Sequence, residues 1–335
     1  MAKKYKLPRF LSLGAVVAVI CMGVIASPIV AFASASTASS SNSTTISPAA
    51  IKFGVIVAGG TDDQLAQQLQ NVAIVANEKP SLVTTYSSFG GNSSAPISTL
   101  DMISTRGATP IVTWEPWQAG AGSTQPAYRN TEITAGRYDS YISSWGSALA
   151  KWGKPVIIRY AHEMNGSWYP WSDGINGNAE GSYVDSYRHV HDLVTAAGAT
   201  NVSWMWSPNT VFAGSAPLLS EYPGTAYVDY AGVDGYNWGN TRASMKWLTP
   251  AKIFSATLAQ LRIVAVSKPI VISEVASTES GGSKATWNGQ LLSYLSSQND
   301  VVGFTWFNIN KESDWRIESS TESASAFASA LSTRR

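Results

Sequence analysis

The chain is 335 residues long, which is enough for one large α/β barrel of about 250 residues. Charged residues make up only 13% of it, and 13 tryptophans contribute to an aromatic content of 11%. Four of the 23 Lys and Arg residues lie in the first nine positions, which leaves 19 basic against 22 acidic residues, a balance of −3. This balance argues against a nucleic-acid partner, and the tryptophans favour flat surfaces that stack on sugar rings.

The first 35 residues have the three parts of a secretory signal peptide. A basic start precedes an apolar run from Phe10 to Ile25, and two small-residue cleavage sites follow, Ala31-Phe32-Ala33 and Ala33-Ser34-Ala35. An uncleaved membrane anchor is the alternative, because the apolar character continues almost to these sites. We expect removal of residues 1–35, a secreted, extracellular protein and no stable membrane partner afterwards. The single cysteine, Cys21, lies in this segment, so the remaining chain has no thiol for a disulfide, a nucleophile or a metal site.

Residues 36–50 are mostly Ser, Thr, Ala and Asn, and we predict a flexible linker there. From Ile51 onward, apolar runs suited to buried strands alternate with segments of helical spacing. The expected strands are Ile51–Ala58, Ser81–Tyr86, Thr109–Trp114, Pro155–Tyr160, Val202–Trp206, Tyr227–Tyr236, Pro269–Val275 and Val301–Phe307. The expected helices are Asp62–Asn77, Ile97–Thr105, Thr134–Gly153, Tyr183–Ala197, Pro250–Val266, Gly282–Gln298 and Glu322–Leu331.

This alternation predicts an α/β protein with a single catalytic domain, a (β/α)8 TIM barrel over residues 51–335. An open doubly wound sheet is the competing fold. The turn after the first strand, Val57-Ala58-Gly59-Gly60-Thr61, is not the GxGxxG turn of a dinucleotide-binding sheet. The connection 208–226 is rich in Pro, Gly and Ser and shows no clear helix.

The stretch VIIRYAHEMNGSWYPW, residues 156–171, combines a buried-strand pattern with charged and aromatic residues where the strand ends. It is not the zinc motif HExxH, because Gly166 stands where the second His would be. An i,i+4 helical ion pair between Arg159 and Glu163 is disfavoured by the β-branched run before it and Asn165-Gly166 after it. The segment HEMNGSWYPW resembles the acid/base motif of glycoside hydrolase family 26, mostly endo-β-mannanases with some β-glucanases and xylanases.

The resemblance extends from about Ile51 to the C-terminus and implies a pair of catalytic carboxylates. Glu163 ends the fourth strand and would be the general acid/base. Glu274 ends the seventh strand, 111 residues later, and would be the nucleophile. Two such carboxyls about 5–5.5 Å apart support hydrolysis with retention of anomeric configuration. The alternative for Glu274 is a helix-capping carboxylate.

Further site residues follow from the other strand ends and from the resemblance. Tyr236, at the end of the sixth strand, would align the nucleophile, and a half-buried core Tyr is its alternative. Arg159 is expected to pair with carboxylates at the mouth, and His162 to donate to a substrate hydroxyl, although a lone His is often structural. The remaining residues expected to line the sugar site are Trp114, Trp168, Trp306 and Asp234, with a core role as the alternative for Trp114.

One departure from the family pattern bears on the substrate. Mannanases that this chain resembles usually carry a Gly-His pair in the loop after the first strand, whereas this chain has Ala58-Gly59-Gly60-Thr61-Asp62. We expect a secreted, retaining endo-β-glycanase acting on β-mannan or glucomannan, with β-1,3-1,4-glucan as the second substrate. A non-catalytic polysaccharide-binding protein is the alternative from another class, and an enzyme acting on peptidoglycan is a third possibility. We expect a monomer whose partner is the polysaccharide, with no cofactor and no catalytic metal.

Overall fold

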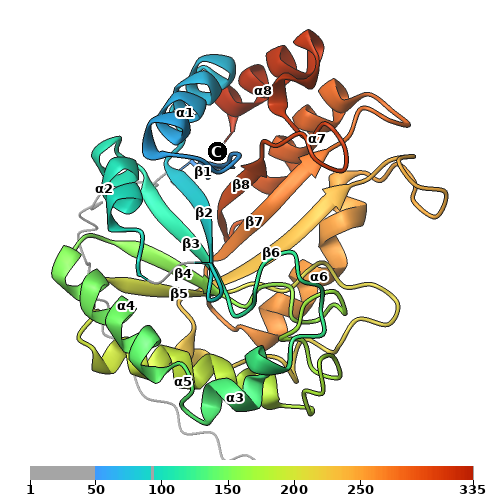
Figure 1. The fold of residues 1–335 in the computed structure, drawn as a ribbon. Helices are drawn as coiled ribbons and strands as arrows, with labels where there is room; N and C mark the ends of the chain where they lie inside the picture. The colour runs from blue at the N-terminus through green and yellow to red at the C-terminus, as the bar shows by residue number, and fades with distance from the viewer. Residues whose placement is uncertain (1–49, 92–93, 335) are drawn as a thin grey trace, which may run out of the picture. The chain divides into compact units, whose positions relative to one another are not determined.

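A computed structural model describes residues 50–91 and 94–334. Eight parallel strands form a closed barrel in chain order, with β8 pairing with β1 to complete it. Figure 1 shows the strands converging at the centre and the helices surrounding them. The prediction of a (β/α)8 barrel is confirmed. The predicted signal peptide, residues 1–35, and almost all of the linker, residues 36–50, lie outside the described residues.

The strands are β1 (Lys52–Ile56), β2 (Leu82–Ser88), β3 (Thr109–Glu115), β4 (Val156–Tyr160), β5 (Val202–Trp206), β6 (Tyr230–Asn237), β7 (Ile270–Ser277) and β8 (Val301–Phe307). The α-helices are α1 (Asp62–Ala76), α2 (Ile97–Thr105), α3 (Asn130–Thr134), α4 (Asp139–Trp152), α5 (Ser182–Ala196), α6 (Pro250–Val264), α7 (Lys284–Ser296) and α8 (Thr321–Thr333). Three short 3₁₀ helices are η1 (Pro126–Tyr128), η2 (Thr225–Tyr227) and η3 (Ile317–Ser319). In this part of the chain no helix is long and apolar enough to cross a membrane.

The third predicted helix, Thr134–Gly153, differs from the structure at its start. The chain forms the short α3 first and turns at Gly136, whose φ of +88° lies in the left-handed region that favours glycine. Helix α4 then begins at Asp139. The segment 208–226, which we expected to lack a helix, contains only the first two residues of η2.

Local sequence signals explain why the helices start and pack as they do. Helix α1 begins after Thr61, whose side chain accepts from the backbone N–H of Gln64, while the Gln64 side chain accepts from the backbone N–H of Thr61. Leu65, Leu69 and Val72 recur every three or four residues and are buried against the barrel. A capped start and one apolar face are sufficient to dock the helix on the strands.

The barrel interior is built in layers because side chains of a strand alternate between its two faces. The lowest layer is an apolar cluster of Leu82, Ile111, Ile157, Met205 and Val271. Two residues further along the same strands, the interior becomes polar and buried, with Thr84, Thr113, Arg159, Ser207 and Ser273. One more step of two residues brings Tyr86, Glu115 and Asn209 to the carboxyl-end mouth. The apolar layer thus closes the bottom of the barrel, and the polar layers above it place polar side chains at the mouth, where barrel enzymes have their active sites.

Candidate active site

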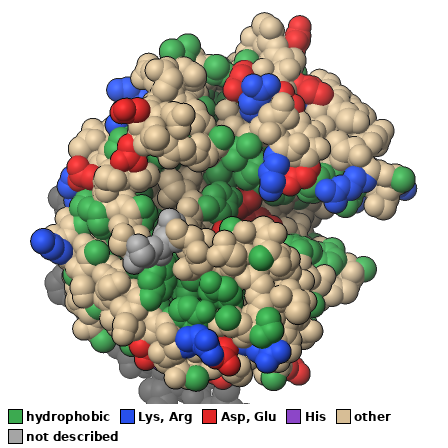
Figure 2. Space-filling view, viewed as in Figure 1, with side chains coloured by type: hydrophobic (Ala, Val, Ile, Leu, Met, Phe, Trp, Pro, Cys, Tyr) green, Lys and Arg blue, Asp and Glu red, His purple; other side chains and the backbone are tan. Residues whose placement is uncertain are grey.

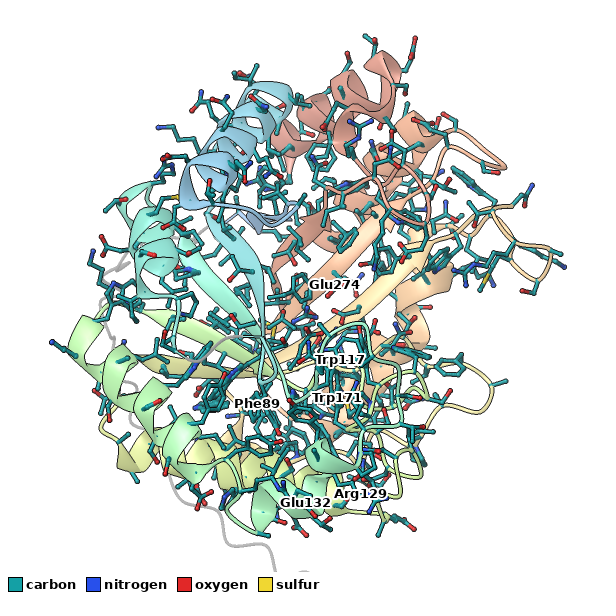
Figure 3. The ribbon with its side chains drawn as sticks, viewed as in Figure 1. Phe89, Trp117, Arg129, Glu132, Trp171 and Glu274 are labelled. Carbon is teal, nitrogen blue, oxygen red and sulfur yellow. The ribbon has the colours of Figure 1, made fainter. Side chains whose placement is uncertain are left out.

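Glu274 lies in the second half of β7, near the centre of the mouth (Figure 3). The Tyr236 hydroxyl donates to its Oε2 at 2.5 Å and the Tyr86 hydroxyl to its Oε1 at 2.7 Å. The Arg159 guanidinium also donates to Oε1. Burial opposes ionisation of Glu274, but the Arg159 charge and the two hydroxyls outweigh it and lower the pKa of Glu274 to about 2. Glu274 is therefore a carboxylate at any moderate pH.

Arg159 and Asp234 form a fully buried support beneath Glu274. Arg159 Nη1 donates to Asp234 Oδ2 at 2.7 Å, and its Nε donates to Thr113 Oγ1 at 2.9 Å. Asp234 Oδ1 accepts from the Ser273 hydroxyl at 2.7 Å. Arg159 makes the ion pairs expected from the sequence, but neither Arg159 nor Asp234 has surface exposed to a substrate. Their assignment as substrate-binding residues was wrong, because both side chains point into the polar interior layer and position Glu274.

Glu163 lies three residues after the end of β4 and accepts hydrogen bonds from two donors. The Trp168 indole N–H donates to Oε2 at 2.7 Å, and the Asn209 side-chain amide donates to Oε1 at 2.6 Å. Burial raises the pKa of Glu163, and the nearby charge of Glu274 raises it further, to about 7, against the two hydrogen bonds that lower it. Glu163 can therefore carry a proton at a pH where Glu274 is ionised.

The backbone that presents Glu163 is strained. Ala161 and Glu163 have φ values of +47° and +52°, a left-handed conformation that costs a non-glycine residue about 1–2 kcal/mol. Backbone hydrogen bonds from Ala161 N to Trp114 O at 3.0 Å and from Glu163 N to Ser207 O at 2.7 Å hold this conformation. The chain thus turns sharply at the end of β4 and directs the carboxyl of Glu163 into the mouth.

His162 lies beside Glu274 and is 2% exposed. Its Nε2 is 4.0 Å from Glu274 Oε1 and 3.2 Å from the Tyr169 hydroxyl. Burial, reinforced by the Arg159 charge, lowers the pKa of His162 to about 3, so the imidazole is neutral. A neutral imidazole beside the nucleophile can exchange a hydrogen bond with a ligand hydroxyl, which is the role predicted for it.

Three of these side chains have the spacing of a metal-binding group. One ligand-type atom each from His162, Asp234 and Glu274 lies within 4.8 Å of the others. The Arg159 guanidinium already donates to both carboxyl groups. Its single positive charge pairs with ionised Glu274, while burial raises the pKa of Asp234 well above its usual range. The chemistry of this cluster is therefore that of an ion pair built from the chain itself.

Two tryptophans predicted to line the sugar site are core residues instead. Trp114 is fully buried and stacks on Trp145 of α4 with 4.4 Å between ring centroids. Trp306 is also fully buried. Its ring centroid lies 5.1 Å from that of Phe327 of α8, and its indole N–H donates to Trp315 O. Each points outward because it is one residue away from the inward-facing position on its strand.

Trp168, which was predicted to line the sugar site, lies at the surface of the mouth. It is 40% exposed, and its ring is 5.8 Å from that of Phe212, which is 45% exposed, at an interplanar angle of 29°. Because the Trp168 indole N–H donates to Glu163, this aromatic pair adjoins the proton-bearing carboxyl. Figure 2 shows that the face is hollowed, with acidic side chains inside the hollow and hydrophobic ones along it.

Several residues of the mouth, chiefly Tyr86, Glu115 and Asn209, were not predicted as site residues from the sequence. Tyr86 and Asn209 each hydrogen-bond one of the two carboxyls, and Glu115 is the last residue of β3. A signal for all three was present, because each lies four residues after an apolar residue that faces the barrel interior. Counting in steps of two from Leu82, Ile111 and Met205 would have located them.

The chain is similar to known proteins in its sequence. The family model of glycosyl hydrolase family 26 matches residues 96–312. Endoglucanase H of Acetivibrio thermocellus is 37% identical over 236 residues, which cover 69% of this chain and 25% of that protein. A mannan endo-1,4-β-mannosidase of Bacillus subtilis is 30% identical over 102 residues, covering 29% of this chain and 27% of that protein. The chain thus spans about a quarter of the length of either relative.

Solved structures share the fold at low sequence identity. The catalytic domain of the endo-β-1,4-mannanase of Bacillus sp. JAMB-750 superposes with a TM-score of 0.64 at 17% identity, covering 85% of this chain and 86% of that one. A β-mannanase from a symbiotic protist of the termite Reticulitermes speratus gives 0.60 at 15% identity, covering 85% and 87%. These likenesses concern the fold alone, whereas the family model covers well over half of the sequence. The chain belongs to glycosyl hydrolase family 26.

Proposed function

We propose that the protein is a secreted, retaining endo-β-glycanase. The observation that carries the proposal is a pair of buried carboxyls in one barrel mouth with contrasting surroundings. Glu274 accepts from Arg159 and two tyrosine hydroxyls, which lower its pKa, whereas Glu163 accepts only from neutral donors and burial raises its pKa. Two carboxyls whose environments push their pKa values apart are suited to be nucleophile and general acid. Family membership supports the same reaction class.

In the proposed first step, Glu274 attacks the anomeric carbon while Glu163 donates its proton to the departing glycosidic oxygen. The hydroxyls of Tyr236 and Tyr86, with Arg159, fix the attacking carboxylate in place. Forming the glycosyl ester removes the negative charge of Glu274, so the pKa of Glu163 falls. Glu163 can then take a proton from water, which attacks the same carbon and releases the sugar with its original anomeric configuration.

The sequence favoured mannan or glucomannan over β-1,3-1,4-glucan, and we propose the reverse order, with β-1,3-1,4-glucan as the better substrate and mannan or glucomannan as the second. The similarity to endoglucanase H extends over 236 residues, against 102 for the Bacillus subtilis mannan endo-1,4-β-mannosidase. The loop after β1, Val57–Thr61, carries no histidine that could contact a mannose ring. The Trp168–Phe212 pair would stack on sugar rings on the leaving-group side, because it adjoins Glu163.

The direct test is hydrolysis by the chain from Ser36 onward of lichenan, mannan, glucomannan and xylan. We expect reducing ends to appear on lichenan faster than on mannan, and NMR of the first product to show the β-anomer. Release of the α-anomer would contradict retention. Retention of polymer on an affinity gel with no reducing ends from any of the four would favour the non-catalytic binding protein instead.

The pH dependence of kcat/KM should be bell-shaped with widely separated limbs. Activity requires ionised Glu274, so it falls on the acid side only as the pH approaches about 2. Activity also requires protonated Glu163, so it falls as the pH rises through about 7. Initial rates at low substrate between pH 3 and 9 measure the alkaline limb and should show almost no loss of activity down to pH 3. A profile that keeps rising above pH 8 would contradict the assignment of Glu163 as the acid.

A further inference from the structure

A third carboxyl, Glu115, lies in the mouth and is not used by the proposed reaction. It is the last residue of β3, two positions after Thr113, which accepts from Arg159 inside the barrel. Because side chains of a strand alternate, Glu115 points to the same inner side as Thr113, one layer closer to the opening. Glu115 is 7% exposed, so its carboxyl is enclosed by the walls of the mouth.

The neighbours of Glu115 do not balance the cost of burying its carboxyl group. The Trp117 indole N–H lies close enough to lower the pKa of Glu115, yet Trp117 Nε1 is buried and has no hydrogen-bond partner among the described residues. Burial dominates and raises the pKa of Glu115 to about 7, with the charges of Glu274 and Glu163 adding to the rise. A polar group buried without a partner is destabilising, so this arrangement calls for an outside group.

A carboxyl oxygen beside an indole N–H matches one sugar hydroxyl. A hydroxyl can accept a hydrogen bond from the indole and donate its own proton to the carboxyl at the same time. The sugar held nearest is the ring whose anomeric carbon reacts, because Glu115 lies in the same mouth layer as Tyr86 of the paired strand β2, whose hydroxyl donates to Glu274. We propose that Glu115 and Trp117 Nε1 together bind a ring hydroxyl of the reacting pyranose and thereby select the substrate. This inference rests on the proposed function and adds a specificity-determining pair to it.

Replacing Glu115 should lower the activity without lowering the stability of the fold. A structural carboxylate would destabilise the fold when replaced, whereas a carboxyl kept for substrate would leave the fold as stable or more stable when replaced. We expect Glu115→Ala to lower kcat/KM on lichenan by about 10-fold to 100-fold, as for loss of a hydrogen bond to an ionisable group. Glu115→Gln, which keeps one donor and one acceptor, should recover part of this loss. Both variants should unfold at the wild-type temperature or above it.

The decisive measurement uses aryl β-cellobiosides in which single hydroxyls of the reacting ring are replaced by hydrogen. Removing a hydroxyl lowers kcat/KM, and this loss is compared between wild type and Glu115→Ala for each ring position. At one position the loss should be at least about 10-fold smaller in Glu115→Ala, because that variant no longer has the side chain that binds the hydroxyl. Glu221→Gln is the matched control, a buried carboxyl on the connection between β5 and β6, and it should keep the wild-type pattern. Equal penalties in wild type and Glu115→Ala at every position would overturn the proposal, as would a lower unfolding temperature of both Glu115 variants.

Failure of the two proposals can be told apart. If wild type hydrolyses none of the polymers or aryl glycosides, the proposed function fails and this inference fails with it. If wild type is active and Glu115→Ala keeps wild-type kcat/KM on lichenan and glucomannan, only the role of Glu115 and Trp117 is overturned.

Discussion

Glu274→Ala is expected to lower kcat/KM on the polymer by about three orders of magnitude or more, because it removes the group on which the proposed reaction forms its covalent intermediate. In the wild type, Tyr236, Tyr86 and Arg159 donate hydrogen bonds to the Glu274 carboxylate. Alanine at position 274 offers these donors no carboxylate oxygen to hold toward a substrate. Azide should restore part of the activity by entering the vacated space. It would attack from the face that Glu274 normally occupies and give the α-glycosyl azide.

Glu163→Ala is expected to show a different pattern, which identifies its role. Hydrolysis of the polymer should fall by about 100-fold to 10,000-fold, because the leaving oxygen is no longer protonated. An aryl glycoside with an acidic leaving group needs little protonation, so formation of the glycosyl ester should be nearly unaffected and the ester should accumulate. Azide would then attack that ester from the opposite face and give the β-glycosyl azide.

These two variants are measured by steady-state kinetics, by a pre-steady-state burst of the aryl leaving group and by NMR of the azide products. Glu221→Gln again serves as the control and should behave as wild type. The same azide anomer from both variants would refute the assignment of nucleophile and acid. So would a Glu163→Ala enzyme that is equally impaired on polymer and on activated aryl glycoside.

The period of the hydrophobic pattern was sufficient to predict the fold. Eight apolar runs separated by helical segments leave few alternatives to a closed barrel, and the capped starts of helices such as α1 are local signals. The candidate carboxyls could also be predicted, because HEMNGSWYPW resembles the acid/base motif of the family and Glu274 ends the seventh apolar run. The split between α3 and α4 at Gly136 was not resolved, because a single turn changes the periodic pattern only slightly.

The limits of the prediction lie in the direction of individual side chains. Trp114 and Thr113 are equally compatible with a strand end, yet a shift of one residue decides whether a side chain meets the sugar or helix α4. Arg159 and Asp234 belong to strands from opposite parts of the sequence, so their fully buried ion pair becomes visible only after the barrel closes. Sequence spacing therefore predicted which residues gather at the mouth better than it predicted their depth.

Replacing Arg159 tests whether its buried ion pairs stabilise the fold and position Glu274. Arg159→Met leaves the Asp234 and Glu274 carboxylates buried without their counter-charge, and we expect it to reduce the free energy of unfolding at pH 7 by about 3–5 kcal/mol. It should also reduce kcat strongly, since Glu274 then loses the charge that keeps its pKa low. Arg159→Lys should restore little, because one ammonium cannot reproduce the fork that contacts Asp234, Glu274 and Thr113.

The pH dependence of this destabilisation has a defined sign. In wild type the pKa of Glu274 is lower folded than unfolded, so the ion pair stabilises the fold above the unfolded pKa near 4 and less as the pH falls toward 2. In Arg159→Met the carboxyls prefer to be protonated, so the gap between wild type and variant should narrow from pH 7 to pH 4. Urea unfolding at the two pH values measures it, and Arg159→Met combined with Asp234→Asn should regain part of the loss. A pH-independent difference would mean that Arg159 contributes packing rather than charge.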